Sequence, residues 1–185
     1  MKKTNKGFSL VELIIVIAIM AILAGAIAPA LIRYIDKSRR SNDVSAAKTI
    51  KTAIETAMAK EKAYEGFTGG NSANITDQDG NVIYYNGWLS FTAGTETASN
   101  ATTGAVTINS GSWSGSDSAT AAQEIATNIG EKTPRIKYKK DPTTNSAATT
   151  QSFNAYVSQG GSVVVGITSD SKFFQLAPTV SEYYQ

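Results

Sequence analysis

Hydrophobic residues follow two different patterns in the first third of the chain. Residues 13–32 form a run of 20 without a charged side chain, mostly Ile, Leu, Ala and Val. As a helix, this run would be about 30 Å long, which is the thickness of the hydrocarbon core of a bilayer. A simple secretory signal peptide is a poorer explanation, because its apolar stretch is usually about 7 to 15 residues long. The run predicts a membrane-spanning helix, and basic residues on both flanks leave its orientation open.

Beyond the uncharged run, the pattern changes to a single apolar face. Apolar residues recur at spacings of three and four, and charged residues occupy the other faces, which is typical of an amphipathic helix. The apolar positions are Val44, Ala47, Ile50, Ile54, Ala57 and Met58. We therefore expect one helix from Phe8 to about Ala63, ending near Gly66, whose second half packs against the rest of the chain.

From residue 71 onward, short apolar runs between turn residues predict strands. Val82–Tyr85 and residues 88–91 flank Asn86-Gly87, a strong two-residue hairpin signal, and so predict a hairpin. A short helix at residues 118–129, capped by Asp117 and ended by Gly130, is also expected. Further strands are expected at residues 105–108, 135–139, 152–158, 162–168 and 172–176, with tight turns at 159–161 and 169–171.

These elements together predict an α+β fold with four regions. Residues 1–7 form a short basic head, and residues 8–32 form the membrane-spanning half of the long helix. Residues 33–65 continue that helix as its amphipathic half. Residues 66–185 form a β-rich domain, whose antiparallel sheet packs with its inner face on the helix.

Composition excludes several classes of function. The chain has no cysteine and no histidine, so thiol nucleophiles, disulfides, imidazole bases and the usual zinc ligands are absent. We find no constellation of paired carboxylates and therefore predict no enzyme, no cofactor and no metal site. Asp77-Gln78-Asp79-Gly80-Asn81 resembles the start of a calcium loop, but Trp88 stands where the bidentate acid belongs, so a plain turn is favoured. A net charge of +2 without a dense basic block predicts no nucleic-acid binding.

Glu12 is out of place at the entry to the apolar run. An unpaired carboxylate inside a membrane costs about 2.5 to 3.5 kcal/mol at the centre and less near the interface. A compensating cation is therefore expected. If the chain is cut after Gly7, the new α-amino group of Phe8 provides one, and a neighbouring copy's Phe8 amine would pair with Glu12 inside a bundle of helices.

Pro29 interrupts the hydrogen-bond ladder of the predicted helix. It has no amide hydrogen to donate to the carbonyl of Gly25, and its ring crowds that carbonyl. Gly25 adds a second local weakness. A kink at Gly25 and Pro29 is therefore expected.

The amino-terminal residues resemble a known family. Residues 6–12, with the sequence Lys-Gly-Phe-Ser-Leu-Val-Glu, and the apolar run after them resemble the class III signal segment of type IV pilins and pseudopilins. The resemblance covers roughly the first 40 residues. It implies a pilin fold, cleavage between Gly7 and Phe8, N-methylation of Phe8, a role for Glu12 in assembly, and local unwinding of residues 21–29 during assembly.

The resemblance also implies a function and a set of partners. The chain would enter the cytoplasmic membrane as a single-pass precursor, surrounded by lipid, and then join a helical filament at the cell surface. Its partners would be copies of itself and other pilins, a prepilin peptidase and methyltransferase, a membrane assembly platform and the ATPase of that platform. The absence of cysteine in an exported chain favours a Gram-positive surface.

Alternatives remain open from the sequence. A pseudopilin of a type II secretion system shares every amino-terminal feature, and a minor pilin would differ only in abundance. A membrane-anchored enzyme or binding module is disfavoured, because no catalytic constellation is found. Adhesion, twitching motility and DNA uptake cannot be told apart.

Overall fold

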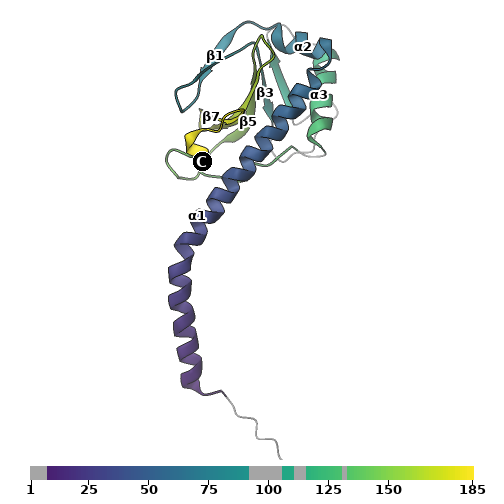
Figure 1. The fold of residues 1–185 in the computed structure, drawn as a ribbon. Helices are drawn as coiled ribbons and strands as arrows, with labels where there is room; N and C mark the ends of the chain where they lie inside the picture. The colour runs from purple at the N-terminus through teal and green to yellow at the C-terminus, as the bar shows by residue number, and fades with distance from the viewer. Residues whose placement is uncertain (1–7, 92–105, 111–115, 131–132) are drawn as a thin grey trace, which may run out of the picture. The chain divides into compact units, whose positions relative to one another are not determined.

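A computed structural model describes residues 8–91, 106–110, 116–130 and 133–185. The chain divides into two compact units, Met1–Ser38 and Arg39–Gln185. Helix α1, Leu10–Ala57, contributes to both units (Figure 1). The second unit combines the end of α1 with two further helices and seven strands among the described residues. The expected α+β fold, with a long amino-terminal helix followed by antiparallel sheets, is confirmed.

The single helix predicted to reach Ala63 is wrong at its end. Helix α1 stops at Ala57, and a separate helix, α2, spans Glu61–Thr68. Between them the amides of Ala59 and Lys60 donate to carbonyls only three residues earlier, at 3.2 and 3.3 Å, which tightens the last turn. The break turns Phe67 of α2 into the same core that Ala57 occupies.

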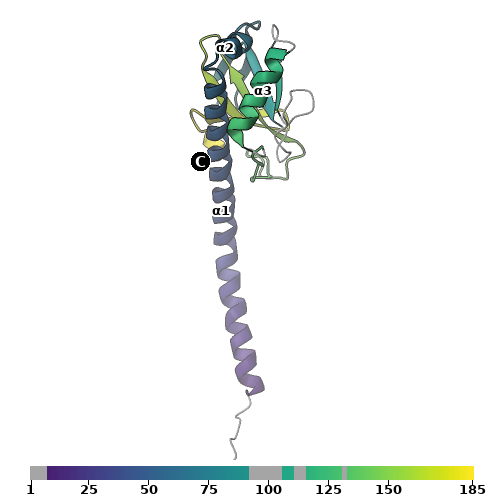
Figure 2. The same ribbon diagram turned by 90° about the vertical axis from the view of Figure 1, so that its right-hand side faces the viewer.

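The amphipathic face of α1 is confirmed in the second unit. Ala47, Ile50, Ile54 and Ala57 are almost completely buried, and Met58 just beyond the helix is also buried. They belong to one core cluster with side chains of the sheet and of helix α3, Ser116–Ile129. Figure 2 shows α3 alongside this part of α1.

Five antiparallel strands form the main sheet in the order β4-β3-β5-β6-β7. Their bounds are Gly87–Phe91 for β3, Val106–Ser110 for β4, Gln151–Val157 for β5, Val163–Ser169 for β6 and Lys172–Ala177 for β7. One row across the sheet joins four buried side chains by direct pairing: Phe91, Phe153, Ile167 and Phe174. This row is part of the core shared with α1, so the predicted packing of the sheet on the helix is confirmed.

The hairpin predicted around Asn86-Gly87 is wrong. Strand β2, Val82–Tyr85, pairs with β1, Ala73–Thr76, whereas β3 begins at Gly87 and pairs with β4 and β5. A type I′ turn needs positive φ at both central residues, and neither Asn86 nor Gly87 has it. A Cβ atom at Gly87 would lie 2.7 Å from the carbonyl oxygen of Phe67, so this glycine permits the close approach of α2.

The true hairpin turn is the segment that resembled a calcium loop. The Asp77 carbonyl accepts from the Gly80 amide at 3.1 Å, and Gly80 has a φ of 85°. The Asp77 carboxylate accepts from the Asn81 amide at 2.7 Å and from Asn81 Nδ2 at 3.0 Å. The favoured reading of this segment as a turn is confirmed.

The last three strands and their turns lie where the sequence predicted them, within one or two residues. Asp170 and Ser171 have φ of 46° and 71°, and Gly161 has 78°, as their tight turns require. The predicted strand at 105–108 is β4, and the predicted helix is α3, which begins two residues earlier than expected. Asp117 therefore lies inside α3 instead of capping it. Gly130 ends the helix as predicted, with a φ of 106°. The Ser- and Thr-rich segment 92–120 predicts an exposed loop apart from the strand; its residues 92–105 and 111–115 lie outside the described residues, and its residues 116–120 belong to α3.

The strand predicted at residues 135–139 is also wrong, because a buried carboxylate takes the backbone hydrogen bonds that a strand would use. Asp43 of α1 accepts from the Lys137 amide at 2.6 Å and from the Tyr138 amide at 2.9 Å. Next to it, Arg40 donates to the Tyr138 hydroxyl at 2.8 Å and lies 4.4 Å from the centre of the Tyr138 ring. The Tyr138 hydroxyl donates to Asn145 Oδ1 at 3.0 Å. This Asp43 cluster fixes residues 137–145 to α1.

The environment of Asp43 is unusual for a carboxylate. Burial raises its pKa to about 6, although the two backbone amides and the charges of Lys139 and Lys137 act in the opposite direction. Tyr184, whose pKa is raised by its own burial and by the charge of Asp43, packs edge-on against Tyr138. The charged form of Asp43 therefore lowers the stability of the folded second unit.

Stability should therefore fall as the pH rises from about 4 to about 6. The folded chain keeps a proton on Asp43 that the unfolded chain, with its ordinary pKa of 3.8, has released. The rise in the pKa of Asp43 from 3.8 to about 6 corresponds to a loss of roughly 3 kcal/mol in the free energy of unfolding. Stability should level off above pH 6. Urea denaturation of the full chain between pH 4 and 7 measures this slope.

Asp43→Asn is the matched variant, because it removes the titration. Its free energy of unfolding should be lower throughout, since the amide can accept only one of the two hydrogen bonds cleanly, but flatter across this pH range. Asp141 does not confuse the comparison. Its burial alone would raise its pKa, but bonds from Thr143, Thr144 and Lys172 lower it to about 2, so it titrates below the window. An equal slope in both proteins would contradict the assignment.

Candidate assembly site

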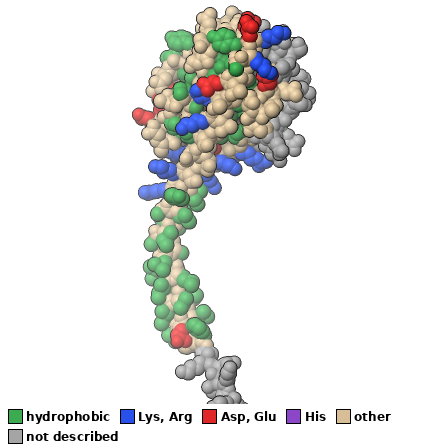
Figure 3. All heavy atoms as spheres, turned by 45° about the vertical axis from the view of Figure 1, so that its right-hand side comes forward, with side chains coloured by type: hydrophobic (Ala, Val, Ile, Leu, Met, Phe, Trp, Pro, Cys, Tyr) green, Lys and Arg blue, Asp and Glu red, His purple; other side chains and the backbone are tan. Residues whose placement is uncertain are grey.

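The first unit carries an exposed apolar surface. No residue in the most apolar 18-residue window of α1 is buried, and among the described residues α1 is the one helix long and apolar enough to span a membrane. Figure 3 shows hydrophobic side chains covering this helical surface. The large exposed side chains are Phe8, Leu10, Val11, Leu13, Ile14, Ile15, Val16, Ile17, Ile19, Met20, Ile22, Leu23, Ile27, Leu31, Ile32, Tyr34 and Ile35. A surface of this kind needs either lipid or other apolar helices around it.

Glu12 lies at the first turn of α1 and completes a capping box. Its carboxylate accepts from the amide of Ser9 at 2.9 Å, while the Ser9 hydroxyl accepts from the amide of Val11 at 3.3 Å. The Ser9 carbonyl accepts the first helical hydrogen bond, from Leu13, at 3.2 Å. Two amides without an intrahelical partner are therefore satisfied at the start of the helix.

Ser9 is the residue of this site whose role the sequence analysis missed. The signal was present as Ser-Leu-Val-Glu, the Ser-x-x-Glu spacing of a capping box immediately before an apolar run. The interaction also places the charge. Because the Glu12 carboxylate folds back to the Ser9 amide, it lies at the amino-terminal end of the helix, next to Phe8 in sequence.

Phe8 is 84% exposed and precedes the first residue of α1. Gly7, the other half of the predicted cleavage junction, lies outside the described residues, as do residues 1–6. The structure therefore brings Ser9 and Glu12 together and leaves Phe8 open beside them.

Gly25 and Pro29 both lie inside α1, which continues as helix through them. A Cβ atom at Gly25 would meet nothing within 4 Å, so the packing of this single chain does not require a glycine there. Pro29 cannot donate to the Gly25 carbonyl, so this turn of the helix has one hydrogen bond fewer than its neighbours.

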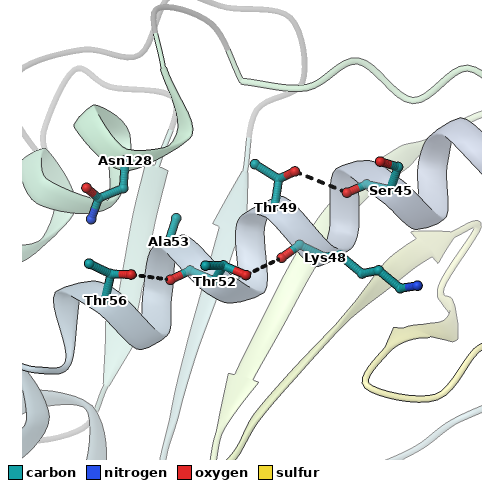
Figure 4. A pocket seen from close by; sticks show the side chains of 7 residues that line it. All are labelled: Ser45, Lys48, Thr49, Thr52, Ala53, Thr56 and Asn128. Atoms are coloured by element: carbon teal, nitrogen blue, oxygen red, sulfur yellow. Dashed lines mark hydrogen bonds between the residues drawn. The ribbon is translucent and has the colours of Figure 1, made fainter.

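The second unit also contains a polar groove. It has a volume of about 450 Å³ and lies between α1 and α3 (Figure 4). Thr49, Thr52 and Thr56 line it, and each hydroxyl donates to the carbonyl four residues earlier, at 3.2, 3.1 and 2.8 Å. Lys48 is the only titratable residue that lines this groove, so it offers no acid and base pair for catalysis.

Comparison with known proteins agrees with the amino-terminal features. Residues 2–28 match the family model described as the prokaryotic N-terminal methylation motif. No solved structure matches the chain.

Several fimbrial proteins are similar to the chain. The type IV major fimbrial protein FimA of Dichelobacter nodosus is 41% identical over 103 residues, which are 55% of this chain and 59% of that protein. Fimbrial protein Q of Moraxella bovis is 43% identical over 77 residues, 40% of this chain and 46% of that protein. The type IV major pilin protein PilA of Myxococcus xanthus is 32% identical over 81 residues, 44% and 36% of the two chains.

The matches thus span 59%, 46% and 36% of the length of these three relatives. Their names and the methylation motif agree with each other and with the long apolar helix followed by an antiparallel sheet. On these findings, the chain is similar to type IV fimbrial proteins over 55% of its length and carries the methylation motif at residues 2–28, in agreement with the resemblance of its amino-terminal segment.

Proposed function

We propose that this protein is a structural subunit of a type IV pilus, polymerised through the apolar first part of α1. The observation that carries the proposal is the exposed apolar surface of residues 8–35, which a single chain leaves uncovered. Packing many copies around a common axis buries this surface outside the membrane. The relatives named as fimbrial proteins support a filament of this kind. They do not favour the alternative of a secretion pseudopilin.

Processing belongs to the same proposal. Cleavage between Gly7 and Phe8 by a prepilin peptidase, followed by N-methylation, would leave Phe8 as the first residue, and the match to the methylation motif supports this step. The chain would wait in the cytoplasmic membrane, surrounded by lipid, with residues 66–185 outside. An assembly platform and its ATPase would then move it into the surface filament. The predicted preference for a Gram-positive surface rests only on the missing cysteines, and no relative supports it.

Glu12 is proposed to pair with the Phe8 amine of a neighbouring copy in the filament. The capping box supports this role, because it holds the carboxylate at the end of the helix where cleavage creates the amine. It also raises a competing explanation, since loss of Glu12 removes a helix cap as well as a charge. The two effects can be separated by choosing substitutions that change one of them.

Amino-terminal sequencing of exported material tests the function directly. Wild-type filaments should begin at a methylated Phe8. Glu12→Ala should still be inserted and cleaved but should give no filaments, because the buried acid that pairs with a neighbour is gone. Intact precursor dispersed in the native membrane, or normal filaments from Glu12→Ala, would contradict the proposal.

Two variants serve as matched controls for the cap. Glu12→Gln keeps a side chain that can close the capping box but removes the charge, and it should also give no filaments. Ser9→Ala keeps the charge and loses one capping bond, at a cost of about 1 kcal/mol to the helix end, and it should still form filaments. The opposite pattern in sheared-filament yields would assign Glu12 to capping alone.

Pro29 and Gly25 are proposed to give the assembled helix a weak point. The missing hydrogen bond between them supports local unwinding of residues 21–29. Filaments of Pro29→Ala should therefore extend less under a given load in single-filament stretching, because the restored bond stabilises this turn. Unchanged stretching of the variant would count against the weak point.

A further inference from the structure

A second groove lies in the second unit, away from the polar groove between α1 and α3. It has a volume of about 590 Å³ and is lined by the turn between β1 and β2 and by the carboxy-terminal segment. Figure 1 shows the tip of the β1–β2 hairpin and the chain end on the same side of the sheet. Three acidic residues, Asp77, Asp79 and Glu182, line this acidic groove, and no lysine or arginine does.

Two of these acids have no partner. The Asp77 carboxylate is already used by Asn81 within the turn. Asp79 and Glu182 are exposed, and within the described part of the chain neither side chain has a hydrogen bond or ion pair. Ser181, which also lines the groove, is only 3% exposed, yet its hydroxyl lacks a hydrogen-bond partner. The Ser181 hydroxyl is itself too buried to contact an occupant, so it is the two carboxylates without a partner among the described residues that point to a cationic occupant.

The wall of the acidic groove also offers apolar surface. Val82 is 51% exposed, and Val180 is half-buried, and both line the groove. Tyr84 lies two residues after Val82 on β2, so it is on the same face of that strand, and it is exposed as well. An occupant with cationic and apolar side chains close together would therefore fit.

Residues 33–37 of α1, Arg-Tyr-Ile-Asp-Lys, combine two basic and two apolar side chains with one acid, Asp36, which already has an interaction of its own. Arg33 and Lys37 are four residues apart, so they share one helix face. Both are exposed, and among the described residues neither has an acidic partner. Tyr34, 73% exposed, lies three residues before Lys37 and supplies apolar surface on the same side of the helix, whereas Ile35 lies on the opposite side. Arg40, three residues after Lys37, already donates a hydrogen bond to Tyr138, so it is not counted among the basic residues that could pair with the acidic groove.

We propose that the acidic groove binds residues 33–37 of α1 from a second copy of this chain. Arg33 and Lys37 would pair with Asp79 and Glu182, while Tyr34 would cover Val82 and Val180. The acid lining excludes an anionic lipid headgroup by repulsion and selects the basic segment by attraction. The groove and the segment are different surfaces, so the contact is head-to-tail and each copy can both give and receive it. Such contacts propagate into helical filaments, and the inference rests on the proposed function.

Engineered cysteines test this contact with no background, because the chain contains no cysteine of its own. Mild oxidation of filaments carrying Lys37→Cys and Glu182→Cys should give a ladder of covalent oligomers, since every copy carries one half of each contact. The control pairs Lys37→Cys with Glu65→Cys, an exposed acid of α2 that does not line the groove, and it should give monomer. No ladder, or an equal ladder in the control, would overturn the proposal.

Charge reversal gives a second, independent readout. Glu182→Lys should lower the yield of sheared filaments by at least about tenfold, because it puts like charges together, and Lys37→Glu in the same chain should restore much of the yield. Glu65→Lys should leave the yield unchanged. Normal yield from Glu182→Lys, or no rescue by the double variant, would overturn the groove contact.

Failure of this inference is distinguishable from failure of the proposed function. Wild-type filaments that neither cross-link through the groove nor respond to Glu182→Lys would remove the contact and leave the pilus subunit intact. A wild-type chain that forms no filaments in its native host would remove both.

Discussion

One constraint governs this protein: the apolar surface at the start of α1 must always be covered. Residues 8–35 expose large aliphatic side chains on every face, so water is an unfavourable environment for them at each stage. Under the proposed function, lipid would cover them in a membrane and neighbouring helices would cover them in a filament. The only acid near the start of this surface, Glu12, is held at the helix end by the capping box, where a cation from another chain can reach it. Coverage and charge pairing therefore favour the same assembled state.

The second part of α1 solves the same problem within a single chain. Its apolar positions narrow to one face, and the sheet and α3 bury most of that face, with Val44 partly buried. One polar residue interrupts it: Asp43 uses both carboxylate oxygens to hold the backbone at Lys137 and Tyr138. The burial that makes this anchor specific also raises the pKa of Asp43 to about 6, so the anchor carries an electrostatic cost. Apolar contacts hold the sheet and α3 against α1. The hydrogen bonds of the Asp43 cluster set the position of residues 137–145.

Acidic and basic residues that could pair with each other lie on different parts of the molecule. Among the described residues, Asp79 and Glu182 have no partner in the acidic groove, and Arg33 and Lys37 have none on α1. A chain with complementary but separate surfaces gains by associating head-to-tail, since each added copy satisfies charges on the previous one. The apolar helix would supply most of the driving force, and the charged contacts would select one arrangement among those that bury the helix.

The sequence by itself determined the long helix, its change from all-round apolar to one-sided and the positions of the last three strands, and it predicts Phe8 and Glu12 as assembly residues. These features depend on local periodicity, turn chemistry or a short motif, which neighbouring residues specify directly. Only the tertiary structure decided the rest. Asn86-Gly87 does not turn, because packing against Phe67 places Gly87 inside the main sheet. Residues 135–139 do not form a strand, because Asp43, about 94 residues earlier, takes their amides. Helix α1 stops at Ala57, and Phe67 of the separate helix α2 packs in the same core as Ala57. In each case, contacts with residues distant in sequence stabilise the observed conformation more than local contacts stabilise the expected one. No local sequence pattern specifies those distant contacts.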